Sequence, residues 1–185
     1  SDLYGGASLA GYHLHKTLCS NGYMSKMVVL NKVSKDCTVL ELKPTIMSFF
    51  EKSINNQIKY TFNYRIGIFL RKIYKLFYAL LKITGREIFY YPTTYRILNQ
   101  IDYKPDFICL FNISEGFFDL TILKDWNNSY NVIYSLQDLW IFTGHCGVPI
   151  DCDKLLKECS VCPDLNLPPK IKFDKTKKNF KLKRE

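Results

Sequence analysis

The pattern of apolar and polar positions near the start of the chain predicts a helix followed by a strand. Apolar residues recur at helical spacing from about Ala7 to Asn21, and Gly22 is typical of the position just beyond a helix end. Residues 24–31 then contain a short, continuous apolar run, which is typical of a strand buried on both faces of a parallel sheet. Residues 33–60 show no clear period, so we expect a loop with short elements there.

The middle of the chain predicts two further buried strands with a helix between them. Residues 107–111 and 131–136 are short apolar runs, and residues 115–126 carry apolar side chains on one helical face. A strand–helix–strand order implies a right-handed crossover, so we predict an α/β fold with a parallel sheet. Ligands of such sheets bind beyond the carboxyl ends of the strands, and residues 112–116 and 137–146 are expected there.

Two other segments have helical patterns. Residues 66–83 combine apolar and aromatic side chains with interspersed Lys and Arg, which predicts a helix with a wide apolar face. This helix could pack on the sheet with its lysines outward, or it could lie on an anionic membrane surface. We favour packing, because a sheet that is covered on both faces needs apolar helices. Residues 95–101 predict another short helix.

The composition is that of a globular protein, with 185 residues of which 47% are hydrophobic and 23% are charged. The net charge of +9 does not spread over the whole chain. Eight Lys and Arg residues lie in residues 170–185, and the remaining 169 residues carry a net charge of only +3. We therefore expect no nucleic-acid partner, and we interpret residues 170–185 as a solvated helix or linker.

The sequence contains neither a signal-peptide pattern nor an apolar run of about 18 residues. We therefore expect a cytoplasmic protein, at the inner face of the membrane if residues 66–83 contact lipid. The chain begins just before a glycine-rich turn and stops inside a charged stretch, so we interpret both ends as cut.

Seven cysteines are present, and four of them cluster near the carboxyl end. The cluster has the spacing C-x5-C-x6-C-x2-C and consists of Cys146, Cys152, Cys159 and Cys162. Four thiolates in a short loop can close a tetrahedral structural zinc site, and the final C-x2-C is the usual close pair of such sites. A disulfide pair and unliganded thiols are the alternatives, and zinc is favoured because the compartment is expected to be reducing. His145 is either a substitute ligand or a residue that lines the ligand cleft.

The remaining cysteines and the first glycines have simpler interpretations. Cys19, Cys37 and Cys109 stand alone and are expected to be buried, reduced thiols. Gly5 and Gly6 precede a predicted helix, where backbone amides can approach an anion at the positive end of the helix dipole. Without a G-x-G-x-x-G or P-loop pattern, these glycines could equally form a flexible turn.

Several motifs taken together resemble the amino-terminal, acceptor-side half of family 4 glycosyltransferases of the kind that makes bacterial surface polysaccharides. They follow the family's order from Asp2 to about Pro168. The motifs are Gly5-Gly6-Ala7, Leu14-His15-Lys16, Lys104-Pro105-Asp106, Asn112-Ile113-Ser114, Gly116-Phe117-Phe118, the segment from Ser135 to Cys146, and Cys159-x2-Cys162-Pro163.

The resemblance implies a GT-B enzyme in which two Rossmann-like domains face a cleft. It implies transfer of a sugar from a nucleotide-sugar, with retention of anomeric configuration, to a saccharide or lipid-linked acceptor. By position, Gly5 and Gly6 would approach the donor phosphates. Asn112, Gln137 and Asp138 would face the acceptor, and Asp138 is the candidate catalytic residue.

The chain departs from the family pattern in ways that bear on activity. The family usually has a histidine where this chain has Gln137, and another where it has Phe111. An amide cannot accept a proton near neutral pH as an imidazole can. The resemblance also implies that residues 1–169, including the Cys-rich loop 144–163, form a Rossmann-like domain whose first strand is missing. Residues 170–185 would lead to a missing donor-binding domain.

We therefore expect a glycosyltransferase fragment that does not transfer sugar by itself. The alternative is a non-enzymatic, zinc-stabilised α/β module that binds a partner or a glycan without chemistry.

Overall fold

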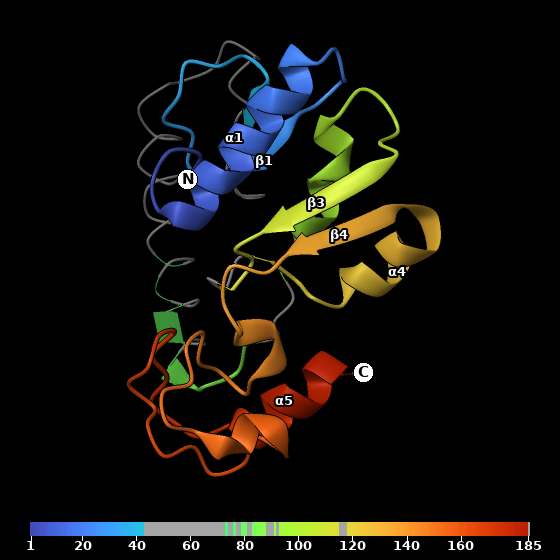
Figure 1. Cartoon of the computed structure of the whole chain (residues 1–185). Coiled ribbons are helices and arrows are strands. Elements are labelled where there is room, and N and C mark those ends of the chain that lie inside the picture. Colours follow the sequence, from blue (N-terminus) through green and yellow to red (C-terminus); the bar gives the residue numbers. More distant parts are fainter. Residues whose placement is uncertain are drawn as a thin grey trace. The chain divides into compact units, whose positions relative to one another are not determined.

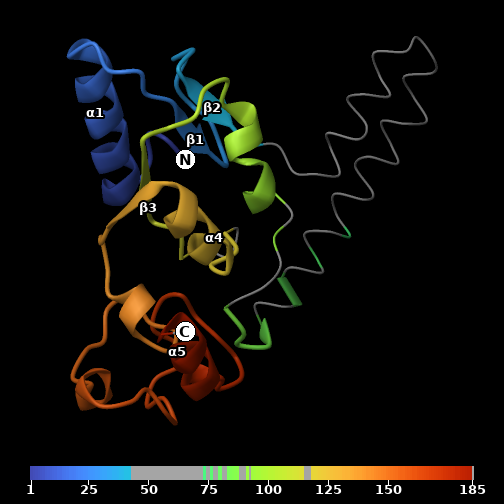
Figure 2. The ribbon, with the colours of Figure 1, turned by 90° about the vertical axis from the view of Figure 1, so that its right-hand side faces the viewer.

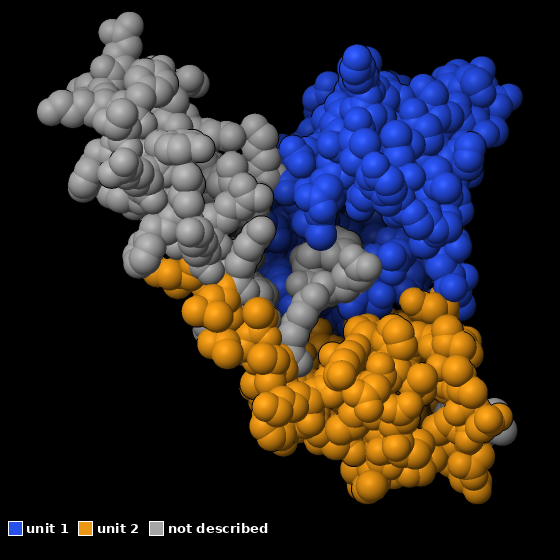
Figure 3. Space-filling view, turned by 90° about the vertical axis from the view of Figure 1, so that its left-hand side faces the viewer, with its two compact units in different colours: residues 1–43, 91–137 blue, residues 44–90, 138–185 orange. Residues whose placement is uncertain are grey.

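The computed structural model describes residues 1–42, 83–87, 91, 93–114 and 118–184, together with residues 73, 76, 79 and 80 (Figure 1). The chain divides into two compact units (Figure 3). Unit 1 comprises residues 1–43 and 91–137, and unit 2 comprises residues 44–90 and 138–185. The predicted boundary at residue 169 stays a prediction.

Unit 1 opens with helix α1 (Gly6–Ser20), as the periodicity predicts. The helix ends in a Schellman motif, in which the N–H groups of Gly22 and Tyr23 donate to the carbonyls of Cys19 and Leu18. Gly22 has a φ of 83°, a conformation that glycine adopts without steric cost. The predicted glycine stop is therefore confirmed.

Unit 1 contains two pairs of parallel strands. Strand β1 (Met27–Val29) pairs with β2 (Val39–Glu41), which lies in the segment expected to be largely loop (Figure 2). Strand β3 (Phe107–Phe111) pairs with β4 (Asn131–Ser135), as the order of predicted elements requires. The fold is thus mixed α/β with small parallel sheets.

The helix between β3 and β4 starts later than its pattern predicts. Helix α4 spans Ile122–Ser129, because the carboxylate of Asp119 accepts hydrogen bonds from the N–H and hydroxyl of Thr121 and fixes a turn there. The predicted apolar side is confirmed, since Phe118, Ile122 and Trp126 are all buried. The rings of Phe118 and Trp126 pack edge to face with their centroids 5.7 Å apart.

The expectation that residues 107–111 form a buried strand is met only in part. Phe107 on β3 is 61% exposed, and Ile133 on β4 is 49% exposed. Leu110, by contrast, is buried. A continuous apolar run satisfies both one-sided and two-sided burial, so periodicity alone does not distinguish them. The predicted short helix at residues 95–101 appears as two 3-10 turns, η1 (Thr94–Arg96) and η2 (Leu98–Gln100).

Unit 2 is built from short elements and long connections. The described part contains η3 (Trp140–Phe142), η4 (Asp153–Leu156) and helix α5 (Thr176–Arg184). The carboxylate of Asp174 caps α5 by accepting hydrogen bonds from the N–H and hydroxyl of Thr176.

Helix α5 corrects the prediction of a solvated tail. Ile171, Thr176, Asn179 and Phe180 are buried. The Asn179 amide donates to the carbonyls of Gly85 and Gly144, at 2.7 and 3.0 Å. Most of the basic residues of this segment do face solvent, but the helix also carries part of the core of unit 2.

The predicted helix at residues 66–83 lies mostly outside the described residues. Residues 73, 76, 79, 80 and 83, which the structure describes, are helical and exposed. Membrane contact through this segment stays a prediction. Within the described part of the chain, no helix is both long enough and apolar enough to span a bilayer.

Candidate functional site

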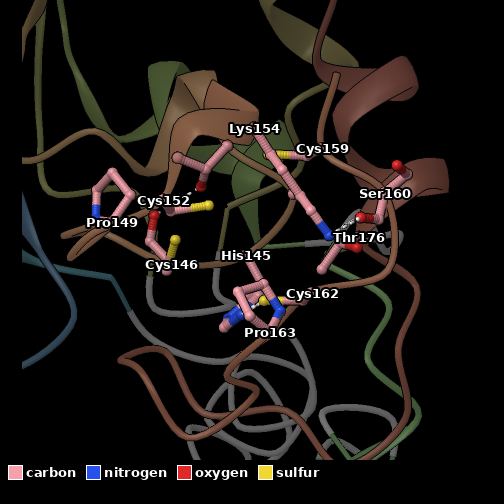
Figure 4. A pocket seen from close by; sticks show the side chains of 12 residues that line it. His145, Cys146, Pro149, Cys152, Lys154, Cys159, Ser160, Cys162, Pro163 and Thr176 are labelled. Carbon is pink, nitrogen blue, oxygen red and sulfur yellow. Dashed lines mark hydrogen bonds between the residues drawn. The ribbon is translucent and has the colours of Figure 1, made fainter. Parts of the chain in front are cut away.

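Four cysteines of unit 2 line a single pocket (Figure 4). We call them the pocket cysteines, and the hollow that they line the cysteine pocket. They are Cys146, Cys152, Cys159 and Cys162, the same four that the spacing singles out. His145, Lys154 and Thr176 also line the pocket. The structure therefore brings all of the predicted metal ligands together from separate turns of one long loop.

The thiols of the pocket influence one another. Burial raises the pKa of Cys146, and the neighbouring Cys162 and Cys159 add to the increase, although a hydrogen bond from Thr143 opposes it. Burial likewise raises the pKa of Cys162, with further increases from Asp174, Cys152 and Cys159. Several thiolates could coexist here only if a cation compensated their charge.

His145 is nearly inaccessible, with 1% of its surface exposed. Its Nδ1 lies 3.2 Å from the carbonyl oxygen of Pro169, and its Nε2 lies 3.1 Å from Sγ of Cys162. A carbonyl can only accept, so Nδ1 carries a proton and, in the neutral ring, Nε2 presents a lone pair toward Cys162. Figure 4 shows the imidazole next to this cysteine.

Polar groups fix the backbone turns that carry the pocket cysteines. The Lys154 ammonium donates to the carbonyls of Ser160 and Val161, between the last two cysteines. The Asp174 carboxylate accepts the N–H of Cys162 at 2.7 Å. The Thr143 hydroxyl, which is fully buried, donates to the carbonyl of Cys146 at 2.6 Å.

The side chains of the pocket do not converge on one point. Among the residues that the structure describes, no three His, Cys, Asp or Glu side chains are arranged as the ligands of one ion. The sulfurs would have to turn inward to close a metal site, so zinc binding by these cysteines stays a prediction.

Asp138 belongs to unit 2 and lies beside the cysteine loop. Its Oδ1 accepts the N–H of Trp140 at 2.9 Å, and this bond starts the η3 turn. The N–H of Leu139 donates to the carbonyl of Gly147 at 2.8 Å. A Cβ on Gly147 would lie 3.2 Å from Oδ2 of Asp138. The predicted catalytic carboxylate therefore contacts the residue that follows Cys146.

The other predicted acceptor residues lie at the carboxyl edge of the β3–β4 sheet in unit 1. Asn112 follows β3 directly and has a φ of 44°, a conformation that asparagine tolerates better than most residues. Its Oδ1 accepts a hydrogen bond from Ser114. Gln137 follows β4, is exposed, and donates to Ser135 Oγ at 2.9 Å. Phe111 pairs with Ser135, so Asn112 and Gln137, which follow these two residues, lie at the same edge of the sheet.

The predicted phosphate-binding glycines lie at the start of α1. Gly5 has a φ of 86°, and Gly6 is the first helical residue. A Cβ on either glycine would meet nothing within 4 Å, so the space around both is open. Figure 1 shows this end of α1 on the side of the sheet toward which β3 and β4 point. Gly11, further along the helix, packs against the ring of Phe111.

Some predictions from the sequence need correction or addition. Cys37 and Cys109 are exposed and Cys19 is partly exposed, so the expectation that these three thiols are buried is wrong. Sequence reasoning did not identify Lys154 or Asp174 as part of the cysteine pocket. For Lys154 the only signal in the sequence is its position between the second and third pocket cysteines, and Asp174 carries no such signal.

No protein-family model, curated protein or solved structure matches the chain. The likeness to family 4 glycosyltransferases therefore rests on the motifs in the sequence.

Proposed function

We propose that this chain is the acceptor-side half of a retaining, family 4-like glycosyltransferase that acts in polysaccharide biosynthesis. The observation that carries the proposal is the meeting of three motif segments at one edge of unit 1. Asn112 and Gln137 extend from the carboxyl ends of paired strands, and Gly5–Gly6 begin the helix that packs against β3. In parallel α/β sheets this edge is where ligands bind.

The chemistry of the edge suits a glycan. The amides of Asn112 and Gln137 can both donate and accept hydrogen bonds, as sugar hydroxyl groups require. The free backbone amides at the start of α1 suit the phosphates of a nucleotide-sugar. Gln137 cannot accept a proton near neutral pH, and the carboxylate of Asp138 is the candidate proton acceptor. In such enzymes the other half makes most contacts with the donor, so this chain alone is not expected to complete a transfer.

We further propose that the two strand pairs are parts of one Rossmann-like sheet. Within the described residues, β1 and β3 each have a single strand partner. Gly11 of α1 approaches both strands, since a Cβ at this position would lie 3.6 Å from Met27 on β1 and 3.3 Å from Phe111 on β3. A parallel strand that leads into α1 would pair with both free edges. The resulting order, β2, β1, new strand, β3, β4, is that of a Rossmann half.

Glycan binding by the isolated chain is the first test. Saturation-transfer NMR with a mixture of bacterial capsular oligosaccharides should show binding that is lost in Gln137→Ala and Asn112→Gly. Glycine keeps the positive φ of residue 112 without the amide, so the second variant removes the side chain without straining the backbone. Asn127→Ala changes an exposed amide on α4 and serves as the control.

Sugar transfer is the second test. The isolated chain should leave radiolabelled UDP-glucose, UDP-galactose, UDP-N-acetylglucosamine and GDP-mannose unconsumed, whereas the chain joined to a donor-binding domain should transfer one of these sugars. A second Rossmann-like domain in the reading frame after Glu185 would supply that domain.

The rival proposal, a non-enzymatic zinc-stabilised module, predicts a different result. A stop codon soon after Glu185, together with partner or glycan binding and no transfer in any joined form, would support the module and overturn the enzyme. The observation that favours it is the packing of unit 2 around its own cysteine pocket.

A further inference from the structure

We propose that the cysteine pocket binds one zinc ion through the thiolates of the four pocket cysteines. The site is structural, because four protein ligands leave no position for a water or a substrate. The inference does not depend on the proposed glycosyltransferase function.

Two independent observations meet in this pocket. The spacing ends in a C-x2-C pair, the usual close pair of structural zinc sites. The folded chain then places the two more distant cysteines in the wall of the same pocket as that pair. Cys37 and Cys109, which lack such spacing, are exposed elsewhere in unit 1. Their spacing and their shared pocket therefore distinguish the pocket cysteines from the other thiols of the chain.

One separation within the pocket can be compared with the geometry of a zinc site. With Zn–S of about 2.3 Å and Zn–N of about 2.0 Å, two ligands of a tetrahedral ion lie about 3.5 to 3.8 Å apart. His145 Nε2 and Cys162 Sγ lie 3.1 Å apart, in the range of an S–H···N contact, so His145 is close enough to be tested as an alternative ligand. A site of four thiolates requires the sulfurs to turn toward one point, because among the described residues no three ligand side chains are arranged around one.

The surroundings favour a negatively charged metal–thiolate cluster. Lys154 brings an ammonium group to the turn between Cys159 and Cys162. Val161 in that turn has a φ of 45°, which a β-branched residue rarely adopts. A metal held by the cysteines on either side of this turn would stabilise it.

Zinc would also order the segment that carries Asp138. The Cys146–Gly147 segment receives hydrogen bonds from Thr143 and from Leu139, and the Gly147 N–H donates to Pro168. Release of Cys146 from a metal would therefore loosen the turn that holds the Asp138 carboxylate.

Metal analysis of the full 185-residue chain tests the proposal. Protein purified under reducing conditions from zinc-supplemented medium should contain about one zinc per chain. Replacement of zinc by Co²⁺ should give the intense sulfur-to-cobalt charge-transfer absorption and the visible bands of a tetrahedral thiolate site. Zinc below about a tenth of an equivalent, with no such cobalt spectrum, would overturn it.

Matched variants assign the ligands. Cys146→Ser and Cys159→Ser should each lose the zinc, whereas Cys37→Ser should retain it. Cys162→His supplies another zinc ligand at the same position and should retain metal even if serine variants fold poorly. His145→Gln should keep the zinc. Loss of zinc in His145→Gln, with retention in Cys146→Ser, would overturn the four-cysteine assignment.

Thiol counting separates zinc from a disulfide. After denaturation with a chelator and without reductant, a zinc site predicts that all seven cysteines react with a thiol reagent. A count lower by two or four would show one or two disulfides and would overturn the proposal.

Discussion

The two units of this chain are stabilised by different means. Unit 1 combines parallel strand pairing with a buried apolar cluster around Ile122 and Trp126, and it also has buried polar side chains such as Asp119. Unit 2 has short elements, and hydrogen bonds from buried polar side chains such as Asn179 and Thr143 connect its long loops. Regular strands and apolar helix faces make much of unit 1 predictable from its sequence. The long loops of unit 2 depend more on a few specific polar side chains.

The largest effect is expected from the buried ion pair of unit 2. Lys183 and Glu87 form this pair with side chains that are 1% and 7% exposed. Burial lowers the pKa of Lys183 and raises the pKa of Glu87, while each partner opposes the shift in the other. Lys183 also donates to the carbonyls of Trp140 and Thr143. Lys183→Met should therefore cost about 3–5 kcal/mol, because it leaves a carboxyl group buried without its partner.

Urea unfolding measures this cost, and hydrogen exchange read by mass spectrometry locates it. Protection should fall in residues 138–184 and remain in β3 and β4. The double variant Glu87→Met/Lys183→Met should recover part of the stability, since it removes both charges. Equal loss of protection in both units would show that the two units do not differ in what stabilises them.

The apolar cluster of unit 1 provides the converse experiment. Ile122 is 5% exposed, so Ile122→Ala should leave a cavity and cost about 3 kcal/mol of unfolding free energy. Hydrogen exchange should increase in β3, α4 and β4 rather than in residues 138–184. Lys124→Ala, an exposed change on the same helix, should stay within about 0.5 kcal/mol. A larger loss in unit 2 than in unit 1 would contradict the assignment of this cluster.

This difference also explains which parts of the structure the sequence predicts. The glycine stop of α1 and the residues of β3 follow from local spacing and from the conformational freedom of Gly22. The late start of α4 does not, because it depends on the Asp119 carboxylate binding Thr121. In unit 2, the pairing of Lys183 with Glu87 joins residues far apart in the chain, and a basic tail carries no signal that one of its lysines is buried.

The candidate sites show the same division. Cysteine spacing singles out the four pocket cysteines as candidate metal ligands, and the structure places these four residues in one pocket. Spacing does not predict Asp174, which reaches Cys162 only through the fold. Asn112 and Gln137 could be expected at one edge, since parallel strands place their carboxyl ends together. Asp138 adjoins Gln137 in sequence but bonds within unit 2, and no local pattern distinguishes these neighbours.

A smaller effect is expected where two segments of unit 2 approach closely. A Cβ on Gly144 would lie 2.5 Å from Cβ and 2.6 Å from the carbonyl oxygen of Thr176. Because one of these atoms belongs to the backbone at the start of α5, Gly144→Ala should cost about 1–3 kcal/mol. Chemical denaturation measures the cost, and Gly6→Ala, at a position with open space, is the control. Equal stability of the two variants would contradict close packing in this loop.

The smallest effect concerns a buried carboxylate in unit 1. Asp2 accepts the N–H groups of Val33 and Ser34 at 2.8 and 3.0 Å. Burial raises its pKa, but hydrogen bonds from Ser34 and Val33 outweigh burial and lower it from 3.8 to about 2. Since the folded pKa lies below the unfolded one, this contribution to stability is present above pH 3.8 and is lost as the pH falls toward 2.

Asp2→Asn should therefore cost about 1 kcal/mol at pH 7, because it weakens the charge-assisted hydrogen bonds to the two N–H groups. The difference from the unmodified chain should shrink as the pH falls from about 4 toward 2, when unfolding is measured in urea at each pH. Asp102→Asn, at an exposed carboxyl group of the same unit, is the control. If the difference for Asp2→Asn stayed constant with pH, the negative charge of Asp2 would not contribute to the stability of unit 1. The proposed role of the charged carboxylate would then be wrong.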